Sequence, residues 1–140
     1  MFSLDIDGVD YYVASTLLEE GFRPRVFVVE YNSAFGPDRN TTVRYSDTFD
    51  QRTIHPSGLY YGVSVNGWKT LLTAYGYRFV TVDQNGVNAF FVHADSFPAA
   101  FTEQMQGITF AENFNQCAKH GTGWEAQFDQ IRGLPLVEIK

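Results

Sequence analysis

The sequence predicts an α/β fold with a mixed sheet that ends in an antiparallel hairpin. A short apolar run, a segment with helical spacing and the continuous apolar run at 26–29 follow one another, an order typical of two parallel strands joined by a crossover helix. Two β-rich runs then flank Asn85-Gly86, a dipeptide that favours a tight hairpin turn. The length of 140 residues predicts one domain, 1–140.

The composition narrows the class of protein. Hydrophobic residues make up 44 % of the chain and aromatic residues 16 %, which indicates a folded globular domain. The net charge of −6 and the scattered basic residues argue against nucleic-acid binding, which needs clustered Lys and Arg. The single cysteine, Cys117, and the short apolar run before Asp5 predict a cytoplasmic protein without a signal peptide or membrane contact.

The first third of the chain predicts a strand–helix–strand unit. We expect a short strand at 4–7, followed by a turn in which Asp10 is the N-cap of a helix over 11–20. Gly21 is a natural end for this helix. The apolar run at 26–29 predicts a strand that is covered on both faces and ends near Glu30.

The rest of the chain alternates between regular and irregular segments. Residues 33–60 are rich in Gly, Pro, Asp and Thr and predict a long loop with a short strand near 42–45. Ser64 is expected to cap a helix over 65–75, which precedes the hairpin at 78–93. The tail from about residue 95 is expected to be irregular, with helices near 98–105 and 124–131 and an extended end that packs back at 134–139.

Polar side chains follow the first two predicted strands. Asp5 and Asp7 lie at the end of the first strand, and Glu30 and Asn32 at the end of the second. The carboxyl ends of adjacent parallel strands meet at one edge of a sheet, where ligands commonly bind. The sequence therefore predicts that Asp7, Glu30 and Asn32 hold a hard cation such as Mg²⁺, with Asp7 and Glu30 as the catalytic candidates.

A purely structural role for the same residues is the alternative. Asp7 and Asp10 would then cap the helix, and Asn32 would begin a turn. This alternative is weaker for Glu30, because a carboxylate after four apolar strand residues is costly to bury unless it is hydrogen-bonded, paired or metal-bound.

The stretch DIDG at 5–8 resembles the nucleophile motif of haloacid-dehalogenase-like phosphatases. The resemblance implies that Asp5 attacks phosphorus, that Asp7 is the acid/base, and that both help to hold Mg²⁺. Such enzymes also need a downstream lysine and a late acidic pair. Lys69 is the only mid-chain lysine, and no acidic pair of that kind follows it.

A broader resemblance covers residues 4–92. The chain is similar to the C-terminal half of class I S-adenosylmethionine-dependent methyltransferases, most of all the FkbM-like group, in the blocks DIDGVDYYV, PRVFVVEYNSAFGP and YYGVSVNGWKTLLTAYGYRFVTVDQNGVNAFFV. The resemblance implies a partial Rossmann-like three-layer sandwich. Its segments would be the fourth strand, a helix, the fifth strand, a second helix and the hairpin of the sixth and seventh strands.

The resemblance also implies a function. Complete members move a methyl group from S-adenosylmethionine to a hydroxyl of a small molecule, and residues at the positions of Asp7 and 30–32 would line the cleft. The glycine-rich loop that such enzymes place after their first strand has no counterpart here. We therefore expect a domain that is incomplete or depends on a partner chain.

The first strand would then have an unpaired edge. We expect a second copy of the chain, a separate N-terminal half-protein or the chain's own tail to cover it. A non-catalytic binding or assembly subunit that uses this edge is the alternative function.

Overall fold

A computed structural model describes all of residues 1–140. The chain forms two sheets, six α-helices and two 3₁₀ helices. The elements are, in order, β1 (Phe2–Leu4), α1 (Asp10–Glu19), β2 (Val26–Glu30), η1 (Ser33–Phe35), β3 (Thr41–Val43), α2 (Gln51–Ile54), α3 (Val65–Ala74), β4 (Tyr77–Val82), β5 (Asn88–His93), η2 (Ala94–Ser96), α4 (Ala99–Met105), α5 (Phe114–His120), α6 (Trp124–Ile131) and β6 (Leu136–Glu138).

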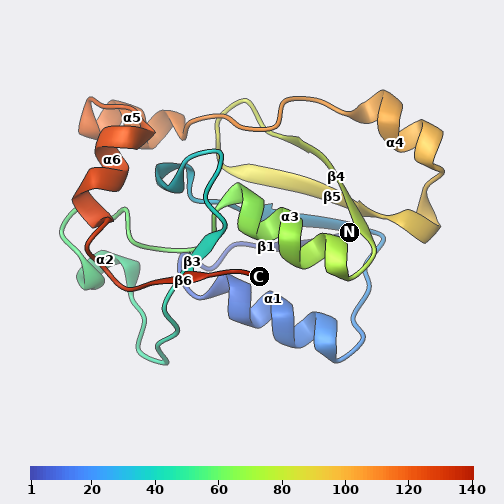
Figure 1. The fold of residues 1–140 in the computed structure, drawn as a ribbon, viewed down its shortest axis with the longest axis horizontal. Coiled ribbons are helices and arrows are strands. Elements are labelled where there is room, and N and C mark those ends of the chain that lie inside the picture. Colours follow the sequence, from blue (N-terminus) through green and yellow to red (C-terminus); the bar gives the residue numbers. More distant parts are fainter.

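The main sheet has the strand order β1-β2-β5-β4 (Figure 1). The strands β1 and β2 are parallel, and Leu4 lies opposite Val29. The strand β5 is antiparallel to both of its neighbours, β2 and β4. The predicted α/β class, crossover helix and terminal hairpin are therefore confirmed.

Local sequence explains the start of α3 and the end of α1. The Ser64 side chain accepts a hydrogen bond from the Gly67 backbone N–H, which makes Ser64 the N-cap of α3 as predicted. After α1, Gly21 adopts a φ of +87°, a conformation that glycine takes without strain. The start of α3 and the end of α1 therefore lie where the sequence indicates.

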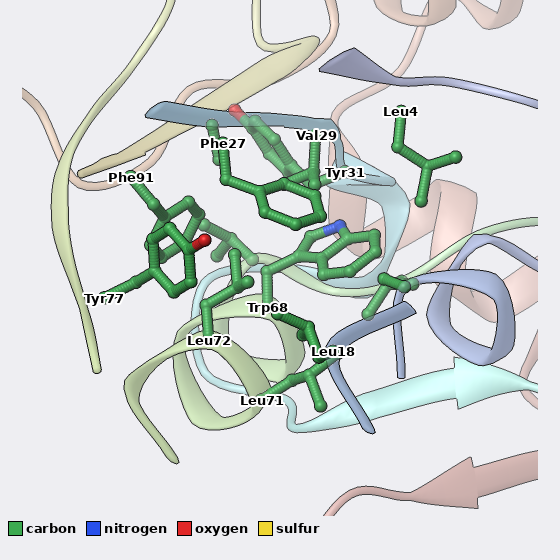
Figure 2. Packing of buried hydrophobic residues seen from close by; sticks show 14 of the residues in the cluster. Leu4, Leu18, Phe27, Val29, Tyr31, Trp68, Leu71, Leu72, Tyr77 and Phe91 are labelled. Carbon is green, nitrogen blue, oxygen red and sulfur yellow. The ribbon is translucent and has the colours of Figure 1, made fainter. Parts of the chain in front are cut away.

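The core lies between the main sheet and the helices α1 and α3. Trp68 is fully buried at its centre, and Figure 2 shows it facing Phe27 and Val29 of β2, with Leu72 beside it. The Trp68 indole N–H donates to the backbone carbonyl of Glu30 at 2.7 Å. This bond joins the core directly to the end of β2.

The opposite face of the sheet is covered only in part. Phe97, Phe101 and Met105, in or just before α4, line a hollow of about 350 Å³ with Val26 and Phe90 of the sheet. Figure 1 shows α4 at one end of the molecule and α2, α5 and α6 gathered at the other. No helix is both long and apolar enough to cross a bilayer.

The beginning of the chain differs from the prediction. The first strand covers Phe2–Leu4 rather than residues 4–7, because the backbone N–H groups of Ile6 and Gly8 donate to the Asp10 carboxylate instead of to a neighbouring strand. Asp10 is the first residue of α1 and does not cap it, since its carboxylate points back to this loop.

The long loop and the tail are more regular than predicted. Residues 33–60 contain η1, β3 and α2, and the tail contains the unpredicted α5 beside the predicted α4 and α6. The extended end forms β6 and pairs with β3, where Val43 lies opposite Leu136. The tail therefore does not cover the free edge of β1, which corrects one of the three expected coverings.

Candidate functional site: a carboxylate cluster at the ends of β1 and β2

The parallel register brings acidic residues together. Because Leu4 is opposite Val29, the next residues, Asp5 and Glu30, leave their strands side by side. Asp7 follows in the loop that leads to α1, with an unusual φ of +53°. The sheet and this loop therefore direct three carboxylates to one place.

Hydrogen bonds hold the loop that carries Asp5 and Asp7. The buried Asp10 carboxylate accepts from the N–H groups of Ile6 and Gly8, both at 2.9 Å. The Gly8 carbonyl accepts from the Gly62 N–H at 2.9 Å, which ties the loop to the segment before α3. Asp10 thus organises the loop without joining the cluster.

The cluster contains Asp5, Asp7 and Glu30. One carboxylate oxygen from each residue lies within 4.8 Å of the others, a spacing suited to one metal ion. Asp5 and Asp7 are exposed, whereas Glu30 is partly buried.

The electrostatics of the cluster are unfavourable for three charges. Burial, followed by the charges of Asp5 and Asp7 and a hydrogen bond with Asp5, raises the pKa of Glu30 to about 9. Burial also raises the pKa of Asp7, with further contributions from Asp5 and Asp10 and an opposing one from Arg52. A proton or a cation must therefore compensate the charge of the cluster near neutral pH.

Tyr61 is a buried residue close enough to the carboxylates for their charges to affect its pKa. It is 2 % exposed, and its hydroxyl accepts a hydrogen bond from Gln116 Nε2 at 2.7 Å. Burial, then the charges of Glu30 and Asp7, raise the pKa of Tyr61 well above its usual value. The phenol therefore stays protonated beside the acidic groups.

Asn32 has a structural role in place of the expected ligand role. Its side-chain oxygen accepts from the Ala34 N–H at 3.0 Å, which caps η1. Its amide nitrogen donates to the carbonyls of Leu59 and Tyr61 at 2.6 and 3.0 Å. The fully buried side chain thus uses its donors and acceptor to join the start of η1 to the segment 59–61.

The cluster contains two of the three predicted cation ligands, Asp7 and Glu30, and adds Asp5. The phosphatase resemblance had implied a role for Asp5 in holding Mg²⁺, and the register of β1 against β2 places Asp5 beside Glu30. Tyr61 and Gln116 come from segments distant along the chain, and no local motif points to them.

The fold and the site define an α/β protein with three carboxylates at the ends of two parallel strands. No family model matches the sequence, and no curated protein or solved structure matches it significantly. The chemistry of the site is therefore inferred from its own geometry.

Proposed function

We propose that Asp5, Asp7 and Glu30 bind a divalent cation that takes part in chemistry on an oxygen atom of a small molecule. The observation that carries the proposal is the approach of three carboxylate oxygens to within 4.8 Å of one another. Carboxylate oxygens are the preferred ligands of Mg²⁺. A bound cation would orient and acidify a substrate hydroxyl.

The residues around the cluster suit this role. Asp10 holds the loop so that Asp5 and Asp7 need little rearrangement to bind. A cation competes with the proton on Glu30, so the free energy of cation binding should grow as pH rises toward 9. The protonated Tyr61 hydroxyl offers a neutral polar group beside the carboxylates.

We further propose that the chain is a methyltransferase-like domain related to S-adenosylmethionine-dependent O-methyltransferases. Support comes from the arrangement of the segments that resemble the fourth and fifth strands, β1 and β2. They are adjacent and parallel with a crossover helix, and the hairpin β4–β5 extends the same sheet. This is the order that the resemblance implies.

The cofactor does not fit the 140 residues alone. The sequence has no glycine-rich turn between a strand and a helix that would hold its nucleotide part. The strand β1 ends the sheet and has no second neighbour. We propose that a second copy or a separate N-terminal half-protein pairs with this edge and completes the cofactor site.

Calorimetric titration of the chain with Mn²⁺ at pH 8 tests the cation site. We expect the variants Asp5→Asn and Asp7→Asn to weaken binding by about tenfold or more, because each removes a charged ligand. Asp38→Asn, which changes an exposed carboxylate elsewhere by the same amount, is the matched control. Equal Mn²⁺ affinity in all four proteins would contradict the proposal.

Titration with S-adenosylhomocysteine, with and without Mg²⁺, tests the methyltransferase part. Micromolar binding, about −8 kcal/mol, by an oligomer would support a rebuilt cofactor site. Absence of binding by the chain alone directs the search to a partner for β1, and capture of a half-protein that restores binding is the positive result. A partner that binds without restoring cofactor affinity would favour the assembly-subunit alternative.

The phosphatase alternative gains one observation, the shared position of Asp5 and Asp7. Another observation argues against it. The Lys69 ammonium group, the candidate for the lysine that such phosphatases need, lies over the Phe79 ring at 4.4 Å, in the α3–β4 region. Hydrolysis of an aryl phosphate that needs Mg²⁺ and disappears in Asp5→Asn would favour the phosphatase over the methyltransferase.

A further inference from the structure

A second polar site lies next to the carboxylate cluster, and it has the opposite charge. A hollow of about 290 Å³ is lined by Arg52, His55 and Lys119 together with Gln51, Pro56 and Gly58, and by no large hydrophobic side chain. A water molecule occupies about 30 Å³ of the liquid, so the hollow has room for a phosphate-sized group. Its cations come from two segments, α2 and α5, which Figure 1 shows at the same end of the molecule.

The cations of this hollow are not neutralised by the protein. The two side-chain ion pairs of the structure involve His93 and Arg132, so neither Arg52 nor Lys119 has a carboxylate within 4.0 Å. The Lys119 Nζ atom lies 3.6 Å from where a Cβ on Gly58 would be, so the ammonium group sits against bare backbone.

His55 also lines the hollow, and one of its ring nitrogens has local hydrogen-bond partners. Its Nδ1 accepts a hydrogen bond from the Ser57 N–H at 3.3 Å and lies 2.8 Å from the Ser57 hydroxyl. The Ser57 oxygen accepts in turn from the Leu59 N–H at 3.1 Å. With Nδ1 used as an acceptor, the neutral imidazole carries its proton on Nε2 and can donate without further protonation.

The hollow neighbours a second one that contains Asp7 of the carboxylate cluster. Gln51 and Arg52 also line an adjoining hollow of about 230 Å³, which contains Asp7 and Asp50. Arg52 is close enough to Asp7 to oppose the rise of its pKa. A small molecule that lies across Arg52 therefore meets cationic donors at one end and Asp7 of the cluster at the other.

We propose that Arg52, His55 and Lys119 form a binding site for an oxyanion, a phosphate or carboxylate group of a small molecule whose remainder extends to the carboxylate cluster. Anion binding in the hollow stands without the cation site, whereas the extension to one shared substrate rests on the proposed function. The site makes a phosphorylated or carboxylated hydroxyl compound the expected substrate class.

NMR titration of the ¹⁵N-labelled chain with inorganic phosphate, without metal and at constant ionic strength, tests the site. We expect saturable shifts of the amide signals of Gly58 and Lys119, and about tenfold weaker binding in Lys119→Met and Arg52→Met. Arg132→Met removes one exposed cation elsewhere and should bind phosphate as the unchanged chain does. Well-dispersed spectra of each variant show that it is folded.

Acetate in place of phosphate distinguishes the two sources of the oxyanion. Saturable shifts with acetate alone assign a carboxylate, and saturable shifts with phosphate alone assign a phosphate. Absence of saturation with both probes, or equal weakening in Arg132→Met and Lys119→Met, would overturn the proposal. Because no metal is present, this failure is separate from a failure of Mn²⁺ binding.

Discussion

Two neighbouring residues of β2 belong to regions with opposite properties. Val29 is fully buried among apolar side chains around Trp68, whereas Glu30 is partly buried beside two other carboxylates. In the core, burial leaves the polar group of Trp68 satisfied, because its N–H has an acceptor. In the cluster, burial and the neighbouring carboxylates both disfavour a charge on Glu30 and raise its pKa to about 9.

This difference indicates that the core around Trp68 stabilises the fold and that the carboxylate cluster destabilises it. Burial of large apolar side chains contributes to the free energy of unfolding, while carboxylates held together without a cation reduce it. Proteins retain such unfavourable clusters mainly at functional sites. Changes in the two regions should therefore alter stability in opposite directions.

The largest effect is expected for Trp68→Ala. The change should lower the free energy of unfolding by about 3–5 kcal/mol, because it leaves a large cavity and the Glu30 carbonyl without its donor. Urea denaturation followed by circular dichroism measures this effect. Trp68→Phe keeps most of the apolar volume and should cost clearly less; equal losses in both variants would argue against cavity formation as the cause.

Asn32→Ala should lower the free energy of unfolding by about 2–3 kcal/mol. The change leaves the buried carbonyls of Leu59 and Tyr61 and the Ala34 N–H without their partner. Mn²⁺ affinity should remain within about twofold of the unchanged chain, in contrast to Asp7→Asn. A tenfold loss of Mn²⁺ affinity in a folded Asn32→Ala variant would restore the ligand role that the sequence predicted for this residue.

Glu30→Gln should raise the stability of the metal-free chain by about 1–2 kcal/mol at pH 7, a value reduced for the partial exposure of the side chain. The pKa of Glu30 is about 9 in the folded chain, above its ordinary value of 4.5, so the folded state binds the extra proton between these values. The stability from this proton is complete below pH 4.5 and is lost as pH rises through 9.

Denaturation over this pH range in the presence of EDTA measures the effect. The free energy of unfolding of the unchanged chain should fall by at most about 1.4 kcal/mol per pH unit from this group, and Glu30→Gln should remove that part of the slope. Asp38→Asn should keep the slope. If Glu30→Gln has the same slope as the unchanged chain, the cluster does not oppose folding.

The sequence predicted the elements around the core well, because the sequence signals for these elements are local. The Ser64 cap and the hairpin around Asn85-Gly86 each depend on a few neighbouring residues, and the structure confirms them. The functional side was predicted in part. Asp7 and Glu30 follow apolar strands and lie together, but Asn32 proved to be a structural hydrogen-bonding residue.

The remaining parts of the site depend on contacts between distant segments. Gln116 reaches Tyr61 across 55 positions of the chain, and Lys119 joins Arg52 only because α5 packs near α2. No periodicity or short motif encodes such pairs. The carboxylate of Asp10 misled the prediction for a different reason, because its contacts are local and capping residues and loop-holding residues share the same chemistry.

The smallest effect is expected for Tyr61→Phe, which tests whether Tyr61 only lies near the carboxylates or also binds the cation. The change removes the acceptor of Gln116 Nε2 and should lower the free energy of unfolding by about 1 kcal/mol. Because the protonated phenol does not coordinate a cation as a carboxylate does, Mn²⁺ affinity should change less than twofold, while Asp7→Asn weakens it about tenfold. The two titrations, made on chains whose folding is verified by circular dichroism, compare the residues directly. A loss of Mn²⁺ affinity in Tyr61→Phe equal to that in Asp7→Asn would make Tyr61 part of the cation site. The cation site would then include a buried residue of the core as well as the three carboxylates.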